Sequence, residues 1–230
     1  MSFALLIRHP VFSIAFTVLT YALATVLHRR WRWIPPIVVA CLPIMALLLL
    51  VREPYEEYNR GGNFLTWLLG PATVALAVPM YRHGVALRRS LPVLALIVLA
   101  GSVVGMTTAG LTAWLLGAPL PVVMSTIPKS VTTPIAIEVC RELKGIPQIT
   151  IALVILAGVL GASFGVPLLR LAGVREDRAI GAAIGTSSHG VGTASLVHHS
   201  EMQAAVSSWA MAAAGVFTSL LAALLKLFLR

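Results

Sequence analysis

Long hydrophobic runs dominate the chain, and short polar loops separate them. The runs consist mostly of Leu, Val, Ile, Ala and Gly, and they are too long and too uniform for strands. Each is close to the length of about 20 apolar residues that a membrane-spanning helix needs. The sequence therefore predicts six spanning helices, at about residues 10–27, 34–51, 63–81, 91–117, 148–171 and 203–229.

Two polar breaks interrupt the membrane-like sequence, near residues 127–134 and 185–193. The first, Ile127-Pro-Lys-Ser-Val-Thr-Thr-Pro134, contains a lysine, three hydroxyl groups and two prolines. The second, Gly185-Thr-Ser-Ser-His-Gly-Val-Gly-Thr193, is rich in glycine and hydroxyl groups. Hydrocarbon tolerates neither a bare cation nor an unpaired backbone group, so both breaks must be buried in protein or line a watery cavity. They predict a site for a polar solute.

The loops orient the chain in the membrane. The loops at 28–32 and 82–89 are strongly basic, and the loop at 52–60 is acidic on balance. The positive-inside rule places the two basic loops in the cytoplasm, which puts the N-terminus outside.

Each polar region, 119–143 and 176–200, fits either a broken helix that crosses the membrane or a re-entrant hairpin that leaves on the side it entered. Two hairpins would put Arg170, Arg175 and Arg178 in the cytoplasm, which the positive-inside rule favours. Two crossing helices would instead put Arg141 and Lys144 there.

A weak internal repeat supports an organisation in two parts. A shift of 59 residues aligns Lys129-Ser-Val-Thr-Thr with Ser188-His-Gly-Val-Gly, and Glu142 with Glu201. A unit of one span and one hairpin would invert between the copies, as in many transporters. We predict an all-α polytopic membrane protein, with scaffold helices at 1–90 and a repeat-containing transport core at 91–230.

Composition excludes a soluble protein. The chain is 58% hydrophobic and only 11% charged, whereas soluble domains average about 25% charged residues. The net charge of +9 comes from Lys and Arg in short loops, which indicates membrane topology and lipid headgroups rather than nucleic acid. Nothing in the sequence predicts an enzyme, a metal ion or a cofactor: the segment that begins at Gly185 is no nucleophile elbow, because no strand precedes it.

The first break predicts a pocket for a carboxylate or a phosphate. Thr133 and Pro134 suit a helix start, as N-cap and first helical residue. The N-terminus of that helix favours an anion, and Lys129 adds a full positive charge. Ser130, Thr132 and Thr133 add hydroxyl groups. In the alternative interpretation, Lys129 snorkels to the interface and the hydroxyl groups only cap the helix.

The second break predicts contacts to the other end of a small oxygen-rich solute. The candidate contacts are Thr186, Ser187, Ser188, His189, Gly190 and Thr193. Histidine side chains ordinarily change charge near neutral pH, so His189 is a candidate for proton coupling; the alternative is a structural histidine that is hydrogen-bonded to a neighbour. Glu138 is a second candidate for proton coupling, or else an ion-pair partner of Lys129 or of an arginine.

Pairs of glycines four residues apart predict close helix packing, within the subunit or in a homodimer. These pairs are Gly101–Gly105, Gly161–Gly165 and Gly181–Gly185.

Both breaks also resemble the two signature segments of the LrgB/CidB family. The matching segments are Pro128-Lys-Ser-Val-Thr-Thr-Pro-Ile-Ala136 and Gly185-Thr-Ser-Ser-His-Gly-Val-Gly-Thr-Ala194. Chain length and span layout also match bacterial members. The resemblance carries the signature positions onto Lys129, Ser130, Thr132, Thr133, Ser187, Ser188, His189 and Gly190.

The resemblance implies one of two functions in the bacterial cytoplasmic membrane. One is transport of small monocarboxylates such as glycolate, glycerate or pyruvate, which agrees with a cation and hydroxyl groups in two breaks. The other is holin- or antiholin-like control of murein hydrolases and autolysis, together with a small LrgA/CidA-type membrane partner. A lesion-forming protein would more naturally carry a polar stripe along a whole helix, so the sequence favours transport by alternating access.

Overall fold

The fold is built from helices that match the predicted spans. The computed structural model describes residues 9–31, 36–197 and 199–228, and these ranges contain helices and no strand. Five helical segments in them are long and apolar enough to cross a membrane: Pro10–Arg30, Tyr55–Arg82, Leu91–Leu115, Pro147–Leu171 and Glu201–Phe228. The apolar helix Pro36–Val51 is shorter and falls on the remaining predicted span. The predicted class, an all-α polytopic membrane protein, is confirmed.

The chain divides into two compact units, Met1–Ala75 and Leu76–Arg230. This boundary precedes residue 90, where the sequence placed the end of the scaffold. The reason is local packing: Met80 and Leu87 lie in one hydrophobic cluster with Val206 of the last helix. The assignment of one part as a scaffold and the other as a transport core stays a prediction.

The first unit contains α2 (Pro10–Arg30), α3 (Pro36–Val51), α4 (Tyr55–Trp67) and α5 (Leu69–Ala75). α2 packs against both α3 and α4. The buried Tyr58 hydroxyl lies 2.8 Å from the Thr17 hydroxyl and donates to the Ser13 carbonyl at 3.2 Å. Gly61 lies directly against the Pro10 carbonyl, so α4 approaches α2 where no larger side chain would fit.

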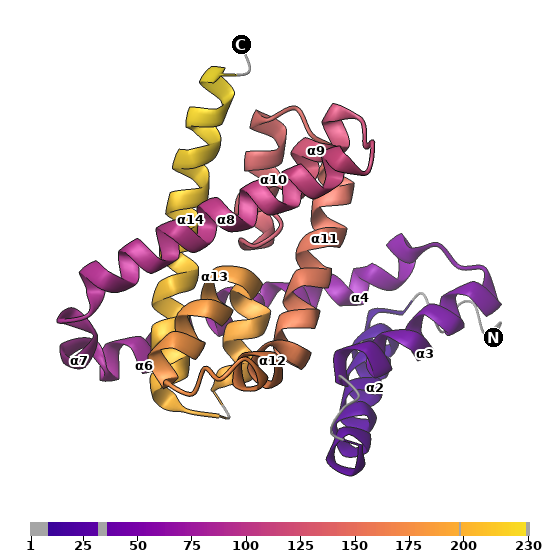
Figure 1. The fold of residues 1–230 in the computed structure, drawn as a ribbon. Helices are drawn as coiled ribbons and strands as arrows, with labels where there is room; N and C mark the ends of the chain where they lie inside the picture. Colours follow the sequence, from indigo (N-terminus) through magenta and orange to yellow (C-terminus); the bar gives the residue numbers. More distant parts are fainter. Residues whose placement is uncertain (1–8, 32–35, 198, 229–230) are drawn as a thin grey trace. The chain divides into compact units, whose positions relative to one another are not determined.

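The second unit is organised around two long helices that cross, α8 (Leu91–Leu115) and α14 (Glu201–Phe228), with their N-termini towards the same end (Figure 1). Shared hydrophobic clusters follow both helices in the same order: Leu94 with Val206, Val98 with Ala210, and Met106 with Ala222. We call the two ends of this pair its N-terminal end and its C-terminal end. The short helices α6 (Ala77–Arg82) and α7 (Gly84–Arg88) lead into α8.

The first polar region forms a hairpin at the C-terminal end of the pair. It consists of α9 (Leu120–Thr126), a break at residues 127–132, and α10 (Thr133–Glu142). Val123 of α9 lies against Gly110 in the C-terminal half of α8. α10 starts beside the middle of α14, where Ile135 approaches Gly215, and ends near its C-terminus, where Lys226 contacts Glu142. The chain therefore returns to the end from which it came, and we call this segment the first hairpin.

The second polar region, α13 (Asp177–Leu196), folds back in the same way at the N-terminal end. A continuous helix of 20 residues would be about 30 Å long. Yet the Ser200 hydroxyl, just beyond the far end, donates to the Asp177 carboxylate at 2.6 Å. The backbone leaves helical geometry at His189 (φ 40°, ψ −141°), and this kink turns the helix back on itself. We call residues 177–200 the second hairpin.

The two hairpins enter from opposite ends, and a long helix precedes each. α8 leads into the first hairpin. The second follows a helical segment of α11 (Pro147–Leu160), the π-helix η1 (Gly161–Gly165) and α12 (Val166–Leu171). Figure 1 shows α9 and α10 towards one end of α14, and α12 and α13 towards the other. This arrangement agrees with the predicted inverted order of span and hairpin, and both polar regions fold back instead of continuing as single straight helices.

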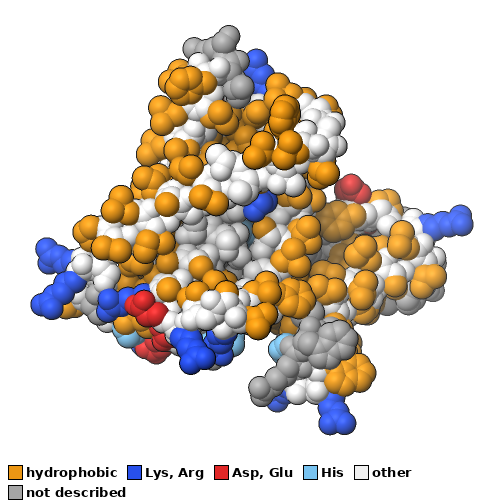
Figure 2. Space-filling view, viewed as in Figure 1, with side chains coloured by type: hydrophobic (Ala, Val, Ile, Leu, Met, Phe, Trp, Pro, Cys, Tyr) orange, Lys and Arg blue, Asp and Glu red, His pale blue; other side chains and the backbone are white. Residues whose placement is uncertain are grey.

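Side-chain chemistry on the surface fits a membrane protein. Figure 2 shows hydrophobic side chains over most of the face in view. Lys and Arg side chains gather at the end of the second unit where α6 and α7 lie (Figures 1 and 2). Aqueous surfaces rarely expose so many large hydrophobic side chains, so the long helices present lipid-facing sides.

Close backbone contact between α13 and α14 gives a test of the second hairpin. A Cβ atom at Gly185 would collide with the Ser207 carbonyl and lie 2.9 Å from Cβ of Ala210. We expect Gly185→Leu to destabilise the protein by about 1–3 kcal/mol, because overpacking forces a backbone shift. Thermal unfolding of the purified protein in detergent measures the effect.

Gly84→Leu is the matched control, because a Cβ atom there has no neighbour within 4 Å. Equal melting temperatures for Gly185→Leu and the control would contradict the described packing of α13 on α14.

Candidate functional site

One cavity in the second unit brings residues of both hairpins together. Its volume is about 380 Å³, within the range of about 300–1,000 Å³ that is typical of small-molecule sites. Lys129 and Ser130 come from the break of the first hairpin, and Thr186 and Ser187 from the last turn before the kink of the second. The remaining lining residues are small or apolar: Ile97, Gly101, Gly105, Ala179, Ala182 and Ala183. We call this cavity the central pocket.

The break of the first hairpin places a cation in the central pocket. Lys129 is half-buried, and its ammonium group donates to the Ser130 hydroxyl at 3.3 Å. The acid nearest in sequence, Glu138, is exposed and pairs with Arg141 at 2.6 Å. Within the described ranges no carboxylate forms an ion pair with Lys129, so its ammonium group has no acidic partner in the pocket.

Two glycines of α8 let both hairpins approach that helix. A Cβ atom on Gly101 would lie 3.1 Å from Cγ2 of Thr186, and one on Gly105 would lie 3.8 Å from the Ser130 hydroxyl oxygen. The glycine spacing predicted close packing, and the structure shows what these two glycines contact. The wall of the pocket that α8 forms at these two glycines therefore consists of helix backbone without side chains.

The hydroxyl groups of the second hairpin differ in their partners. The Thr186 hydroxyl donates to the Ala182 carbonyl at 2.7 Å, one turn earlier, so its oxygen can still accept a hydrogen bond. Ser187 is exposed, and its hydroxyl lies 3.0 Å from that of Ser188. Of the two hydroxyl groups that the second hairpin contributes to the pocket, that of Ser187 is therefore more accessible than that of Thr186.

His189 lies outside the central pocket and holds the kink in place. The ring is buried, and its Nε2 lies 2.9 Å from the Val154 carbonyl of α11. A carbonyl only accepts, so Nε2 carries the hydrogen and donates. The ring packs on Gly158, where a Cβ atom would lie 2.8 Å from Cε1. These contacts correspond to the structural alternative in which a neighbour binds the histidine.

The other candidate residues of the second break also serve packing. Thr193 is buried, and its hydroxyl bonds the His189 carbonyl and the Ser207 hydroxyl. Ser188 faces Gly161 of the π-helix, and Gly190 lies near the sulfur of Met211. None of these three residues lines the central pocket.

The start of α10 differs slightly from the prediction. The N-cap is Thr132, one residue earlier than predicted, and it makes no side-chain capping bond. Thr133 and Pro134 occupy the first turn, and neither Thr132 nor Thr133 lines the central pocket. Glu138 does not line it either, so proton coupling through Glu138 or His189 stays a prediction.

Sequence reasoning missed the three alanines of the site. Ala179, Ala182 and Ala183 line the pocket without carrying any reactive group. The signal was available in the spacing: Ala179 and Ala183 are four residues apart, like the glycines of α8.

Comparison with known proteins identifies relatives over nearly the whole chain. The model of the LrgB-like family matches residues 17–228. An uncharacterised protein of Bacillus subtilis, YwbG, is 36% identical over 210 residues, which cover 90% of this chain and 93% of the relative. The antiholin-like protein LrgB of Bacillus mycoides is 30% identical over 212 residues, which cover 91% and 92% of the two chains. No solved structure matches the chain.

A designed disulfide tests whether α8 and the second hairpin meet. The Cβ position built on Gly101 lies 3.9 Å from Cβ of Thr186, which suits a disulfide. In a background that carries Cys41→Ser and Cys140→Ala, we expect oxidation to cross-link Gly101→Cys with Thr186→Cys. Mass spectrometry of the digested protein detects the cross-link.

The control pairs Gly117→Cys with Thr186→Cys. Gly117 follows the end of α8, 16 residues beyond Gly101, and a helix of that length rises about 24 Å. Cross-linking of the control pair, or none in the Gly101 pair, would contradict the geometry of the pocket.

The contact between His189 and Val154 gives a second test. A non-glycine residue with this backbone conformation costs about 1–3 kcal/mol, which surrounding contacts must offset. Glutamine places an N–H donor at similar reach, whereas leucine places none. We expect His189→Leu to lower the melting temperature in detergent by several degrees more than His189→Gln. Equal losses in the two variants would show that the hydrogen bond does not hold the kink.

Proposed function

We propose that this chain, which belongs to the LrgB-like family, carries small monocarboxylate anions across the bacterial cytoplasmic membrane. The observation that carries the proposal is the central pocket, where two oppositely directed hairpins contribute a half-buried lysine and hydroxyl groups. Helical breaks that meet inside a bundle are a recurring plan of secondary transporters.

The chemistry of the pocket suits a small hydroxy- or oxo-acid. The Lys129 ammonium carries three donors for a carboxylate, one of which contacts Ser130. The hydroxyl groups of Ser130, Thr186 and Ser187 offer hydrogen bonds to a second oxygen of the solute. Glycolate, glycerate and pyruvate combine a carboxylate with such an oxygen, and they are the substrates that we propose.

Transport would follow from the opposite directions of the two hairpins. A solute bound between their breaks can be reached from one end of the unit or the other when the hairpins shift relative to α8. The bare backbone at Gly101 and Gly105 would let those breaks slide past the helix without side-chain collisions. The positive-inside rule supports a cytoplasmic position for the N-terminal end of the α8–α14 pair, where the arginines gather.

A second candidate function rests on the name of a relative. The antiholin-like protein LrgB of Bacillus mycoides covers nearly the full length of this chain. Together with the family resemblance, that name makes the second candidate an antiholin-like control of murein hydrolase activity and autolysis, with a small LrgA/CidA-type membrane partner. The names of such relatives favour this second candidate, whereas the central pocket favours transport, because control of a membrane lesion requires no solute-sized cavity.

Uptake by proteoliposomes tests the proposal. We expect the wild-type protein to take up labelled pyruvate, glycolate or glycerate in a saturable manner and to retain a trapped dye. Lys129→Gln should lower kcat/KM roughly tenfold or more, because a hydrogen bond to a charged group contributes about 1.5–3 kcal/mol.

Lys144→Gln is the matched control, since Lys144 is exposed and does not line the pocket. Dye release by the wild-type protein would favour lesion control over transport. Equal uptake by Lys129→Gln and Lys144→Gln would remove the central pocket as the binding site.

A further inference from the structure

A second cavity adjoins the central pocket at the N-terminal end of α8 and α14. Its volume is about 260 Å³, and it lies between the start of α8 and the start of α13. Arg89, Ser90, Glu176 and Arg178 contribute its polar groups, and Val93 and Leu94 contribute apolar surface. We call this cavity the vestibule.

The vestibule and the central pocket share part of their lining. Ile97, Ala179 and Ala182 line both cavities. Two of these three residues are alanines, so little side-chain volume separates the two spaces. A small anion that enters the vestibule therefore lies next to the residues that surround Lys129.

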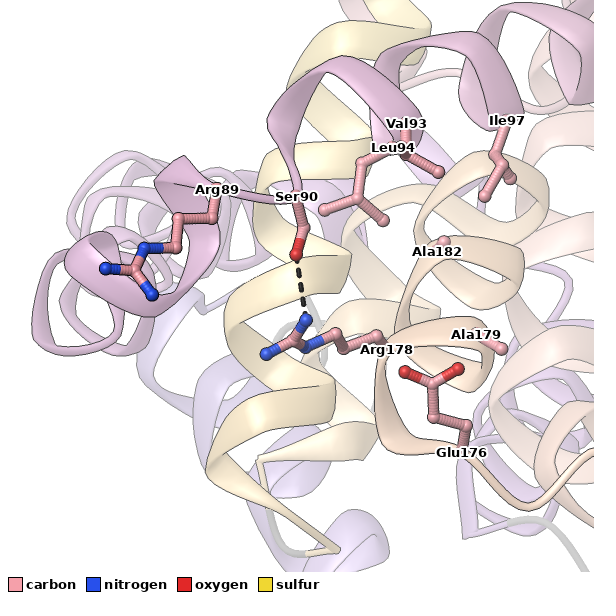
Figure 3. Close-up of a pocket in the computed structure, with 9 residues that line it drawn as sticks. All are labelled: Arg89, Ser90, Val93, Leu94, Ile97, Glu176, Arg178, Ala179 and Ala182. Atoms are coloured by element: carbon pink, nitrogen blue, oxygen red, sulfur yellow. Dashed lines mark hydrogen bonds between the residues drawn. The ribbon is translucent and has the colours of Figure 1, made fainter.

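Arg178 is the best-placed cation of the vestibule. Its guanidinium donates to the Ser90 hydroxyl at 2.8 Å, which fixes it between α13 and α8 (Figure 3). A guanidinium has five N–H donors, and this bond uses one of them. Arg89, in contrast, extends away from the labelled groups around it (Figure 3).

Glu176 is the one carboxylate among the lining residues of the vestibule. It is exposed, and within the described ranges it forms no ion pair with Arg178. Water therefore screens its charge more strongly than that of the half-buried Arg178. The charges that line the vestibule therefore favour the binding of an anion.

We infer that the vestibule is a second anion site, at which Arg178 captures a small carboxylate before it reaches Lys129. The inference rests on the proposed transport function, because it makes the vestibule the cytoplasmic access to the central pocket. Arg178 then attracts substrate and raises its local concentration, while Lys129 holds the translocated ion.

Equilibrium binding and uptake of labelled pyruvate together test the inference. The experiment compares full-length wild type, Arg178→Gln, Arg178→Lys and Arg88→Gln in nanodiscs and in proteoliposomes. It uses ionic strengths of about 0.01 M and 0.15 M, at which charges act over about 30 Å and 8 Å. Arg88 is exposed at the same end of the unit and does not line the vestibule, so Arg88→Gln matches the charge change.

We expect Arg178→Gln to raise Kd and KM about three- to tenfold at low ionic strength and less at high ionic strength, with kcat within about twofold of wild type. Arg178→Lys and Arg88→Gln should stay close to wild type. If wild type binds pyruvate and Arg178→Gln keeps its affinity and its salt dependence, the vestibule site is wrong and the proposed transport stands.

The remaining outcomes separate the two proposals further. Binding that depends on Arg178 without any uptake would refute transport and keep the anion site. Absence of both binding and uptake in wild type would refute both. If the effect of Arg178→Gln requires phosphatidylglycerol in the membrane and pyruvate does not compete, the vestibule holds a lipid headgroup and the inference is wrong.

Discussion

A polar backbone inside hydrocarbon must find partners within the protein, and this constraint organises the second unit. Two helical segments are interrupted, at residues 127–132 and at His189. Each break is sheltered by folding back beside a glycine-bearing helix: the first lies against Gly105 of α8, and the second against Gly158 of α11. The two hairpins shelter their polar backbone in the same way but enter from opposite ends of the unit. Their breaks therefore lie close together, and the central pocket is the space between them.

Much of this architecture could be predicted from the sequence, because spanning helices are set by length and hydrophobicity. The two breaks were recognisable for the same reason, since a lysine and a cluster of glycines and hydroxyl groups stand out in apolar sequence. The direction of the hairpins was harder. Arg170, Arg175 and Arg178 favoured re-entry only through the statistics of loop charge, whereas the hydrogen bond between Ser200 and Asp177 shows it directly.

The composition of the site was predicted less well than its position. Hydroxyl groups look alike in a sequence, but a helix turns by about 100° per residue, so neighbours in a break face different surroundings. Ser187 faces the pocket, while Ser188 faces Gly161. His189 attracts attention as a titratable group, yet its ring is directed at Val154. Which side of a kink a residue faces depends on tertiary packing that no local pattern encodes.

The unequal chemistry of the two breaks has a consequence for a carrier with inverted units. If the two breaks were identical, the inward-facing and outward-facing forms would have equal free energies. Here one break contains Pro128, and a histidine in an unfavourable backbone conformation forms the other. If the chain is the carrier proposed above, its two forms would then differ in free energy, and the empty protein would rest preferentially in one orientation that the sequence of the breaks sets.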